Sequence, residues 1–508
     1  MKRLLYVILS LLPIGLTAQN MYEIAPLLQN DITGTSRYIS MGGSMGALGG
    51  DVSVMGSNPA GLAIYRSNDF AFTASMCFNR TNAEYNEHMV KNDDVSFDIE
   101  NFGGVFTNKV NDGSLMKYFN FGIGYRKKNA IVNDFTVAGP SWGYSQQYAI
   151  RELYDNRPFD LGSIDYKDFE NFHYSWLPLL ATYANIGDEH GNLLTDMEGN
   201  LIYSPTDVKF VNEERGGAHE VDLSFATNIN DRFYFGATVS FVNVDYTVNS
   251  VYYENDDFGS IYSIGNYNHI EGNGCNLKLG AILRPFKYSP FKVGVAVHTP
   301  TWYSLKSYSY ADIEGPFGDF YDTRSEELYY GVLETRSKLN SSWRYIASAS
   351  YTFGKLMALN VDYEFTDYST TKYKRLDFST VEAQNEEIAC NLKEQHTVRV
   401  GAEFNLGDGI ALRAGYNYSS APFKTTAYKE MYNMPVTATS TDYNNRFSRE
   451  AVTIGGGYRG KVFYFDMAYM FDTQKSDFYP YYDPQEVNPE AKMEYFNHTV
   501  TATFGMRF

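Results

Sequence analysis

The chain has 508 residues, with 44 Tyr, 35 Phe and 42 Gly, and a formal net charge of -18. A bundle of membrane helices needs several apolar runs of about 18 residues or more, and none follows the first 20 residues. Nucleic-acid binding needs a basic patch, and this acidic chain has no Lys/Arg cluster. A chain rich in Tyr, Phe and Gly with a negative mean hydropathy is typical of a soluble all-β protein or of a β-barrel that meets lipid on its outside.

The N-terminus has the composition of a secretory signal. Lys2 and Arg3 give a basic start, an apolar run of about 13 residues follows, and Thr17 and Ala18 supply small residues before the expected cut. The apolar run is too short to span a membrane comfortably, so a retained anchor is the weaker alternative. We therefore expect residues 1–18 to be the signal peptide of an exported protein.

The cysteines and histidines do not form a site pattern. Cys77, Cys275 and Cys390 are an odd number, far apart, and they include no CxxC pair. The sequence also lacks GxSxG and HExxH motifs. We therefore expect no disulfide framework, no metal site, no cofactor and no enzymatic activity.

From about residue 70 onward, apolar and polar residues alternate with a period of two. This alternation indicates strands whose two faces meet different surroundings. One face of each strand is apolar and aromatic, and the other is mostly polar, charged or small. The clearest runs are residues 70–79, 357–366, 397–404 and 410–418. A soluble sandwich would alternate as well, so the alternation alone does not decide between a sandwich and a barrel.

The connections between the strands favour a barrel. Short turns are expected at residues 228–231, 285–290, 353–355, 406–409 and 458–461. Long polar connections are expected at residues 82–93, 139–216, 250–271, 373–392, 421–445 and 477–489. Short and long connections therefore alternate along the chain. An up-and-down antiparallel barrel, with tight turns at one end and long loops at the other, predicts this order, whereas a Greek-key sandwich does not.

The sequence predicts an all-β fold, a transmembrane antiparallel barrel of about fourteen strands. Their centres lie near residues 75, 101, 122, 222, 240, 279, 296, 346, 362, 400, 414, 452, 467 and 500. The last strand alternates up to the terminal Phe508. Such an ending resembles the C-terminal signal by which outer-membrane barrels are inserted, although a sandwich strand could also end a chain in this way. We therefore expect an outer-membrane location, with membrane lipid and the barrel-insertion machinery as partners.

Residues 19–66 do not alternate and are rich in small side chains. They include a Gly-rich run with Gly42 and Gly43, and a turn-initiating pair, Asn58 and Pro59. The Gly-rich run follows no strand and lacks a Lys-Ser/Thr pair, which argues against a nucleotide site. Close packing of this segment as a plug inside the barrel is the better interpretation.

Several of these stretches resemble the FadL/TodX family of outer-membrane transporters for long-chain fatty acids and other hydrophobic molecules. The matching stretches are residues 37–43, 58–62, 396–403 and 412–416. The resemblance implies that a hatch of residues 19–67 closes a fourteen-stranded barrel of residues 68–508, with cargo leaving through an opening in the wall. It places these residues in the hatch: Asn58, Pro59, Ala60, Gly61, Gly42 and Gly43. The connection 139–216 is longer than the family pattern leads us to expect.

A transported fatty acid would need a cation for its carboxylate and an apolar surface for its chain. The inward-facing basic candidates are Arg126, Lys278, Arg284, His298, Arg344, Arg399 and Arg413, of which Arg399 and Arg413 lie on family-like strands. These arginines could instead pair with lumen carboxylates such as Glu403 and Asp362. A first capture site is expected at Phe172, Tyr174, Trp176, Leu177, Leu179, Leu180 and Tyr183, unless these residues merely pack over the barrel mouth.

The predicted function is import of hydrophobic molecules, with long-chain fatty acids as the expected cargo. We expect the protein to be a monomer and to bind no nucleic acid. The first alternative is a haem receptor that uses His88, His190 and His269 as iron ligands, although isolated loop histidines are usually solvated. The second is an adhesin or structural barrel without transport. The third is a porin, which would have a wide polar lumen and no hatch.

Overall fold

The structure is a computed structural model. It describes residues 21–110, 114–141, 145–147, 149–150, 153, 175–184, 186, 205–256, 259–325, 331–376, 381–429, 436–482 and 488–508. The predicted signal peptide, residues 1–18, therefore lies outside the described residues.

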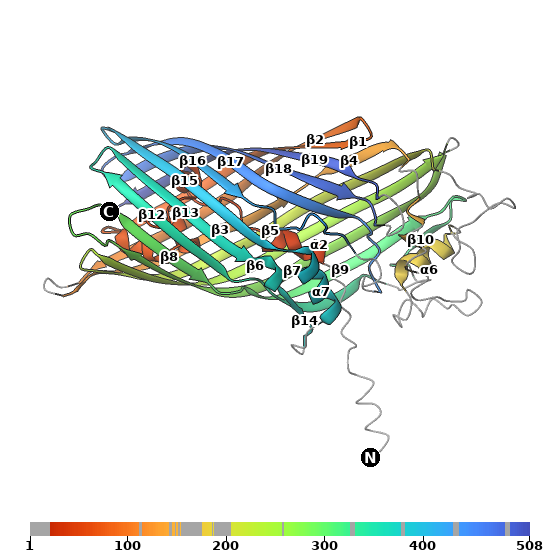
Figure 1. Ribbon diagram of the computed structural model, residues 1–508, viewed down its shortest axis with the longest axis horizontal. Helices are drawn as coiled ribbons and strands as arrows, with labels where there is room; N and C mark the ends of the chain where they lie inside the picture. Colours follow the sequence, from red (N-terminus) through yellow and green to blue (C-terminus); the bar gives the residue numbers. More distant parts are fainter. Residues whose placement is uncertain are drawn as a thin grey trace, which may run out of the picture.

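One antiparallel sheet of nineteen strand segments closes on itself, because β19 pairs with β1 (Figure 1). The segments are β1 (Asp69–Tyr85), β2 (His88–Lys109), β3 (Met116–Val132), β4 (Phe135–Pro140), β5 (Asp207–Ile229), β6 (Phe233–Asp256), β7 (Gly259–Leu283), β8 (Lys292–His298), β9 (Trp302–Glu314), β10 (Phe320–Asp322), β11 (Leu333–Asn340), β12 (Arg344–Phe353), β13 (Met357–Asp367), β14 (Lys372–Lys374), β15 (Glu394–Gly407), β16 (Ile410–Ser419), β17 (Tyr443–Arg459), β18 (Phe463–Tyr479) and β19 (Ala491–Arg507).

Together these segments form fourteen strands that span the barrel from end to end, which confirms the predicted barrel. Four of these strands are each split into two segments, namely β3 with β4, β8 with β9, β11 with β12, and β13 with β14, and β10 is a short addition beside β9. Closure of the sheet excludes the sandwich, because a sandwich has two separate sheets.

The outside of the barrel is apolar. On β1, the outward Phe72, Met76 and Phe78 are exposed, whereas the inward Thr73 and Ser75 are buried. The other strands repeat this arrangement, so exposed Phe, Leu, Ile and Val side chains surround the wall. Apolar side chains outside and polar ones inside are the reverse of a soluble barrel, and they match a wall that meets lipid.

The part of the chain that the structure describes contains no helix long and apolar enough to cross a membrane.

Two predicted long connections are wrong. Residues 82–93 form the ends of β1 and β2 and a tight turn in which Asn86 and Glu87 have φ values of 47° and 66°. Within residues 250–271, β6 continues to Asp256 and β7 begins at Gly259. The strands extend beyond the apolar belt, and there the inward side chains Tyr252, Tyr262 and Ile264 are buried in an apolar cluster, so the pattern of apolar outside and polar inside no longer holds. The alternation that marks a strand in the sequence therefore fades there while the backbone pairing continues.

Two other predicted connections contain regular structure. Residues 139–216 include the beginning of β5 and helix α6 (Trp176–Tyr183), and residues 373–392 include β14 and helix α7 (Glu382–Asn391). Helix α6 lies at the long-loop end of the barrel, beside β10, at the opposite end from the C-terminus (Figure 1).

The chain from residue 21 to residue 66, which we call the N-terminal segment, lies inside the barrel (Figure 1). It contains α2 (Met21–Leu28), α3 (Ser36–Ser40) and two short 3-10 helices, η1 (Val52–Gly56) and η2 (Pro59–Ile64). Its hydrogen bonds reach strands on different sides of the wall. Ser36 N donates to Thr503 Oγ1 at 2.7 Å, and Ser44 Oγ donates to the Asn360 carbonyl at 3.0 Å. The segment therefore fills the lumen, and its role as a movable hatch stays a prediction.

Candidate functional site

The wall has a gap between β2 and β3. These strands pair only from Asn101 opposite Arg126 to Lys109 opposite Tyr118. Beyond this point, β2 continues along β1 and β3 continues along β5, so no ladder joins residues 96–100 to residues 127–132. A cavity in the lumen is lined by both edges, including Ser96, Glu100, Lys127 and residues 129–133. We call this place the wall gap.

The N-terminal segment satisfies the free edge of β3 from inside the barrel. Asp31 N donates to the Lys128 carbonyl at 3.1 Å, and the Ala130 N–H donates to Asp31 Oδ2 at 2.9 Å. Asn129 Nδ2 donates to the Pro26 carbonyl at 2.8 Å. An unpaired strand edge inside a barrel would leave buried polar groups without partners. The segment therefore takes the place that β2 leaves empty.

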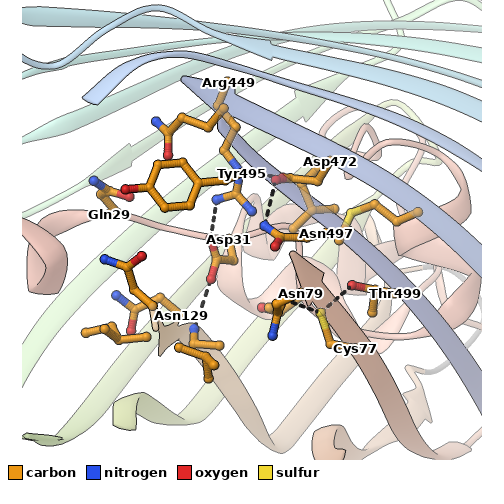
Figure 2. Close-up of a pocket in the computed structure, with 18 of the residues that line it drawn as sticks. Gln29, Asp31, Cys77, Asn79, Asn129, Arg449, Asp472, Tyr495, Asn497 and Thr499 are labelled. Atoms are coloured by element: carbon orange, nitrogen blue, oxygen red, sulfur yellow. Dashed lines mark hydrogen bonds and ion pairs between the residues drawn. The ribbon is translucent and has the colours of Figure 1, made fainter. Parts of the chain in front are cut away.

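Asp31 is fixed by a chain of polar groups from β17 to β19 (Figure 2). Arg449 forms ion pairs with both Asp31 and Asp472, and Asn497 Nδ2 donates to Asp472 Oδ1 at 3.2 Å. Burial alone would raise the pKa of Asp31, but the Arg449 guanidinium and the Ala130 N–H hold that pKa below its ordinary value. Asp31 is therefore ionised at neutral pH.

Side chains, rather than backbone, connect the two edges of the wall gap. The buried Lys127 on β3 places Nζ 2.7 Å from Asp98 Oδ2 and 3.7 Å from Glu100 Oε1, both on β2. Nearer the long-loop end, Arg215 on β5 places Nη2 3.1 Å from Asp94 Oδ1. Among the described residues, side-chain contacts therefore take the place of a backbone ladder between β2 and β3 here.

Two cavities adjoin the N-terminal segment at Pro26 of α2. The first reaches the wall gap, and polar side chains that include Asn79, Thr499 and Asn497 form about half of its lining (Figure 2). The second has more apolar walls, which include Tyr22, Tyr246, Val248, Phe423 and Tyr443. Both cavities are lined by Pro26, Gln29 and Arg446, so the N-terminal segment and one cation separate them.

Arg446 differs from the other lumen arginines of this region. Its Nη1 lies 3.5 Å from Gln29 Oε1, a long contact with a neutral group. Within the described residues, Arg446 forms no ion pair, whereas Arg449 forms two. The sequence analysis did not single out Arg446, because it lies where the alternation of β17 fades.

The predicted ligand arginines lie deeper in the lumen and are paired. Glu364 accepts from Arg399 Nη1 at 2.9 Å and lies 3.3 Å from Arg344 Nε. The backbone carbonyl of Arg399 accepts a hydrogen bond from Ser44 Oγ at 3.3 Å, and a Cβ on Gly43 would touch the Arg399 side chain. The N-terminal segment therefore covers Arg399.

Arg413 and Glu403 form a second cluster against the same segment. Arg413 Nε lies 2.7 Å from Glu403 Oε2, and its Nη1 lies 2.5 Å from Asp466 Oδ1. Glu403 also accepts from Arg37 Nε of the N-terminal segment at 2.8 Å. Ligand contact by Arg399, Arg413, Glu403 or Arg344 stays a prediction.

Asn58 to Ala60 form a rigid start to η2. Asn58 Oδ1 accepts from Ala60 N at 3.2 Å, and Asn58 Nδ2 donates to the Gly46 carbonyl at 2.8 Å. Pro59 occupies the first turn of the helix, where its missing N–H costs nothing. A Cβ on Gly236 of the wall would overlap the backbone of Pro59. This stretch therefore rests directly on β6.

Gly42, Gly43 and Gly61 allow close backbone contacts. Gly42 and Gly43 have φ values of 65° and 74°, which favour glycine. A Cβ on Gly42 would lie 2.9 Å from the backbone nitrogen of Tyr416, and one on Gly61 would lie 3.1 Å from the Cα of Gly49. Their small size thus brings the segment against the wall and against itself.

The remaining predicted residues form no ligand site in the described part of the chain. His88 is exposed, and His269 Nδ1 lies 2.8 Å from Thr247 Oγ1, whereas His190 lies outside the described residues. No group of three metal-ligating side chains occurs among the residues described. Trp176, Leu177, Leu179 and Leu180 are buried in α6, and Phe172 and Tyr174 are outside the described residues.

Comparison with known proteins identifies the fold. No protein-family model and no curated protein matches the sequence. A FadL homologue of Pseudomonas aeruginosa has a TM-score of 0.55 at 12% identity, covering 94% of this chain and 99% of that one. The toluene transporter TodX of Pseudomonas putida has a TM-score of 0.53 at 12% identity, covering 94% and 99%. A deltaS2 mutant of the TodX monoaromatic hydrocarbon channel has a TM-score of 0.56 at 12% identity, covering 94% and 100%. The chain therefore has the FadL-family fold.

Proposed function

We propose that this protein carries hydrophobic molecules across an outer membrane and releases them sideways through the wall gap. The observation that carries the proposal is the end of β2–β3 pairing at Asn101, at the place where a lumen cavity reaches the wall. A passage that opens through the wall would deliver an apolar molecule to lipid without exposing it to water. The exposed apolar belt supplies that lipid contact.

The fold neighbours support the class of cargo. One is named as a FadL homologue and another as a toluene transporter. The second cavity has an apolar wall that includes Tyr246, Val248 and Phe423, which suits a hydrocarbon chain. We propose long-chain fatty acids as the cargo, because the same cavity also contains a cation, Arg446, that forms no ion pair among the described residues.

Arg446 is the proposed first contact for the fatty-acid carboxylate. It lines both cavities and forms no ion pair among the described residues, although the buried Glu214 of the second cavity interacts with its charge, so its guanidinium can meet an anion without breaking an existing ion pair. Contact with Arg399 or Arg413 would follow only after the N-terminal segment moves, because that segment contacts both of their clusters. The hatch role of the segment belongs to the same proposal.

The filled lumen argues against a general porin. The N-terminal segment bonds to strands on different sides of the wall, including Asn120 on β3, Asn360 on β13 and Thr503 on β19. A porin instead needs an open aqueous channel. The haem alternative has no support from the described histidines, since His88 and His269 share no metal-ligand cluster there.

Cross-linking across the wall gap tests the exit route. In a chain whose three native cysteines are replaced by Ser, Asp98→Cys with Lys127→Cys would be joined by a short bismaleimide. The matched control joins Glu271→Cys to Lys306→Cys, an ion pair of 3.2 Å on strands that are fully paired. We expect the first cross-link to abolish fatty-acid uptake by cells and the second to leave it unchanged.

Two results would reject the proposal at different levels. If deletion of the gene leaves fatty-acid uptake unchanged, then this protein does not transport fatty acids. If uptake depends on the gene but survives the cross-link between positions 98 and 127, then cargo leaves by a different route.

A further inference from the structure

The short-turn end of the barrel carries a ring of cations that the transport proposal does not use. The exposed or half-exposed Arg and Lys side chains described there include Arg66, Lys109, Lys117, Arg232, Lys287, Lys355, Arg459 and Lys461. We call this set the basic rim. Among the described residues of the same turns, the exposed or half-exposed carboxylates are Asp231 and Asp408, and Asp231 already pairs with Arg66 at 3.0 Å. This end is therefore positive, although the whole chain has a net charge of -18.

Cations of the basic rim lie beside exposed apolar side chains. Lys287 lies between Phe286 and Tyr288, which are 62% and 89% exposed, and its Nζ is 5.5 Å from the Tyr288 ring centroid. Lys355 precedes Leu356, which is 65% exposed. Arg232 repeats the pairing, because its guanidinium lies 6.0 Å from the ring of Phe233. The same combination therefore occurs on several separate turns.

These turns are distributed around the barrel rather than gathered on one side. They connect β5 to β6, β7 to β8, β12 to β13 and β17 to β18, which are separated by other strands in the closed sheet (Figure 1). A folded protein partner would need a contiguous patch of side chains. A ring of cations and apolar groups instead fits a layer that surrounds the barrel, which is the geometry of a membrane interface.

The chemistry of this ring fits phospholipid headgroups. Aromatic and aliphatic side chains lie at the boundary of the hydrocarbon, and flexible Lys and Arg side chains extend from that boundary to the phosphates. Cations at the membrane surface favour anionic headgroups over zwitterionic ones, which have no net charge.

We propose that the basic rim binds anionic phospholipid headgroups in the leaflet at the short-turn end of the barrel. The inference rests on the membrane-spanning placement proposed above, and it does not depend on the cargo. The rim selects its lipid by charge and holds the barrel at a fixed depth through its apolar side chains.

Lipid association with the full-length protein in bilayers tests the proposal. Spin-labelled phosphatidylglycerol and phosphatidylcholine are compared in bilayers of phosphatidylcholine, and electron paramagnetic resonance measures the fraction of each that is immobilised at the protein. We expect phosphatidylglycerol to associate about fivefold more strongly, the preference that one surface cation provides. The preference should fall as salt is added.

A charge-neutralised variant identifies the residues responsible. The triple substitution Lys287→Gln, Lys355→Gln and Lys461→Gln should reduce the preference towards equal association. The matched control is Lys91→Gln, Lys209→Gln and Lys475→Gln, which removes three exposed cations from the long-loop end. It should keep the wild-type preference. Heat-dependent migration on gels verifies that both variants are folded barrels.

Two outcomes would overturn the proposal. Equal association of the two lipids with the wild type would show that the basic rim does not select lipid by charge. Equal loss of the preference in both triple variants would show a general charge effect without a rim. Because this measurement needs no cargo, a lipid preference combined with absent fatty-acid uptake would reject the transport proposal alone.

Discussion

Asp31 and Arg449 form an ion pair across 418 positions of the sequence, inside the barrel and beside the wall gap. Asp31 also accepts the N–H of Ala130 at 2.9 Å, so one carboxylate connects β17 to the free edge of β3. The N-terminal segment cannot leave that edge unless this carboxylate gives up both partners. Asp31 is therefore the place where docking of the segment can be weakened by a single substitution.

Asp31→Asn should loosen the N-terminal segment from the wall. The amide can still accept from Ala130 but loses its charge, while Arg449 keeps Asp472 as a partner. Loss of one buried charged contact costs about 1–3 kcal/mol. We expect more frequent channel openings in planar bilayers. Asp408→Asn, in an exposed turn whose φ of 51° suits Asn, is the matched control and should behave as the wild type. If the two variants conduct alike, Asp31 does not restrain the segment.

Docking of the N-terminal segment against the wall should depend on pH. The pKa of Asp31 is lowered in the folded protein, so its ion pair contributes fully above the ordinary aspartate pKa of about 4. That contribution is lost as the pH falls through the lowered pKa. Bilayer conductance should therefore rise below about pH 4 in the wild type. In Asp31→Asn the same acid step should be absent, and a step of equal size in both proteins would assign the acid sensitivity to other groups.

The fourteen spanning strands could be predicted because contact with lipid requires apolar side chains on the outer face of each strand. Phe72 and Val361 face outward, whereas their neighbours Thr73 and Asp362 face inward. This requirement produces the alternation of apolar and polar residues in the sequence. Beyond the apolar belt the outer face no longer has to be apolar, and inward side chains such as Tyr252 and Ile264 are themselves apolar. Residues near Asn86 and Asp256 therefore look like loops in the sequence although they continue the ladder.

The candidate site could be predicted only in part. Arg399 and Arg413 could be placed in the lumen from their strand positions, but not their partners in the N-terminal segment. The contact between Asp31 and Arg449 joins a segment without periodicity to a strand extension where alternation fades. No local sequence pattern predicts such a contact, because it depends on how the N-terminal segment folds back inside the barrel.

Arg446→Gln should reduce uptake of charged cargo more than uptake of neutral cargo. A hydrogen bond to a charged group is worth about 1.5–3 kcal/mol, which corresponds to a loss of roughly tenfold or more in affinity. We expect fatty-acid uptake at low concentration to fall by this order, and uptake of toluene to change little. Arg446→Lys should restore part of the fatty-acid uptake because it keeps the charge.

The control for Arg446 is Arg336→Gln, which removes an exposed arginine that pairs with Glu334 on the outer surface. It should leave the uptake of both cargos unchanged. An equal decrease in toluene and fatty-acid uptake by Arg446→Gln would show that Arg446 maintains the cavity rather than meeting a carboxylate.

Gly236→Ala should displace η2 from the wall while the barrel itself still folds. An added methyl group at position 236 would overlap the backbone of Pro59, and overpacking of this kind costs about 1–3 kcal/mol. Gly456→Ala is the matched control, because its methyl group would meet Leu412 at an ordinary 3.4 Å. We expect protease to cut the N-terminal segment faster in Gly236→Ala only, with heat-dependent gel migration unchanged in both variants. Equal cleavage rates would mean that contact with β6 does not hold the segment in the lumen.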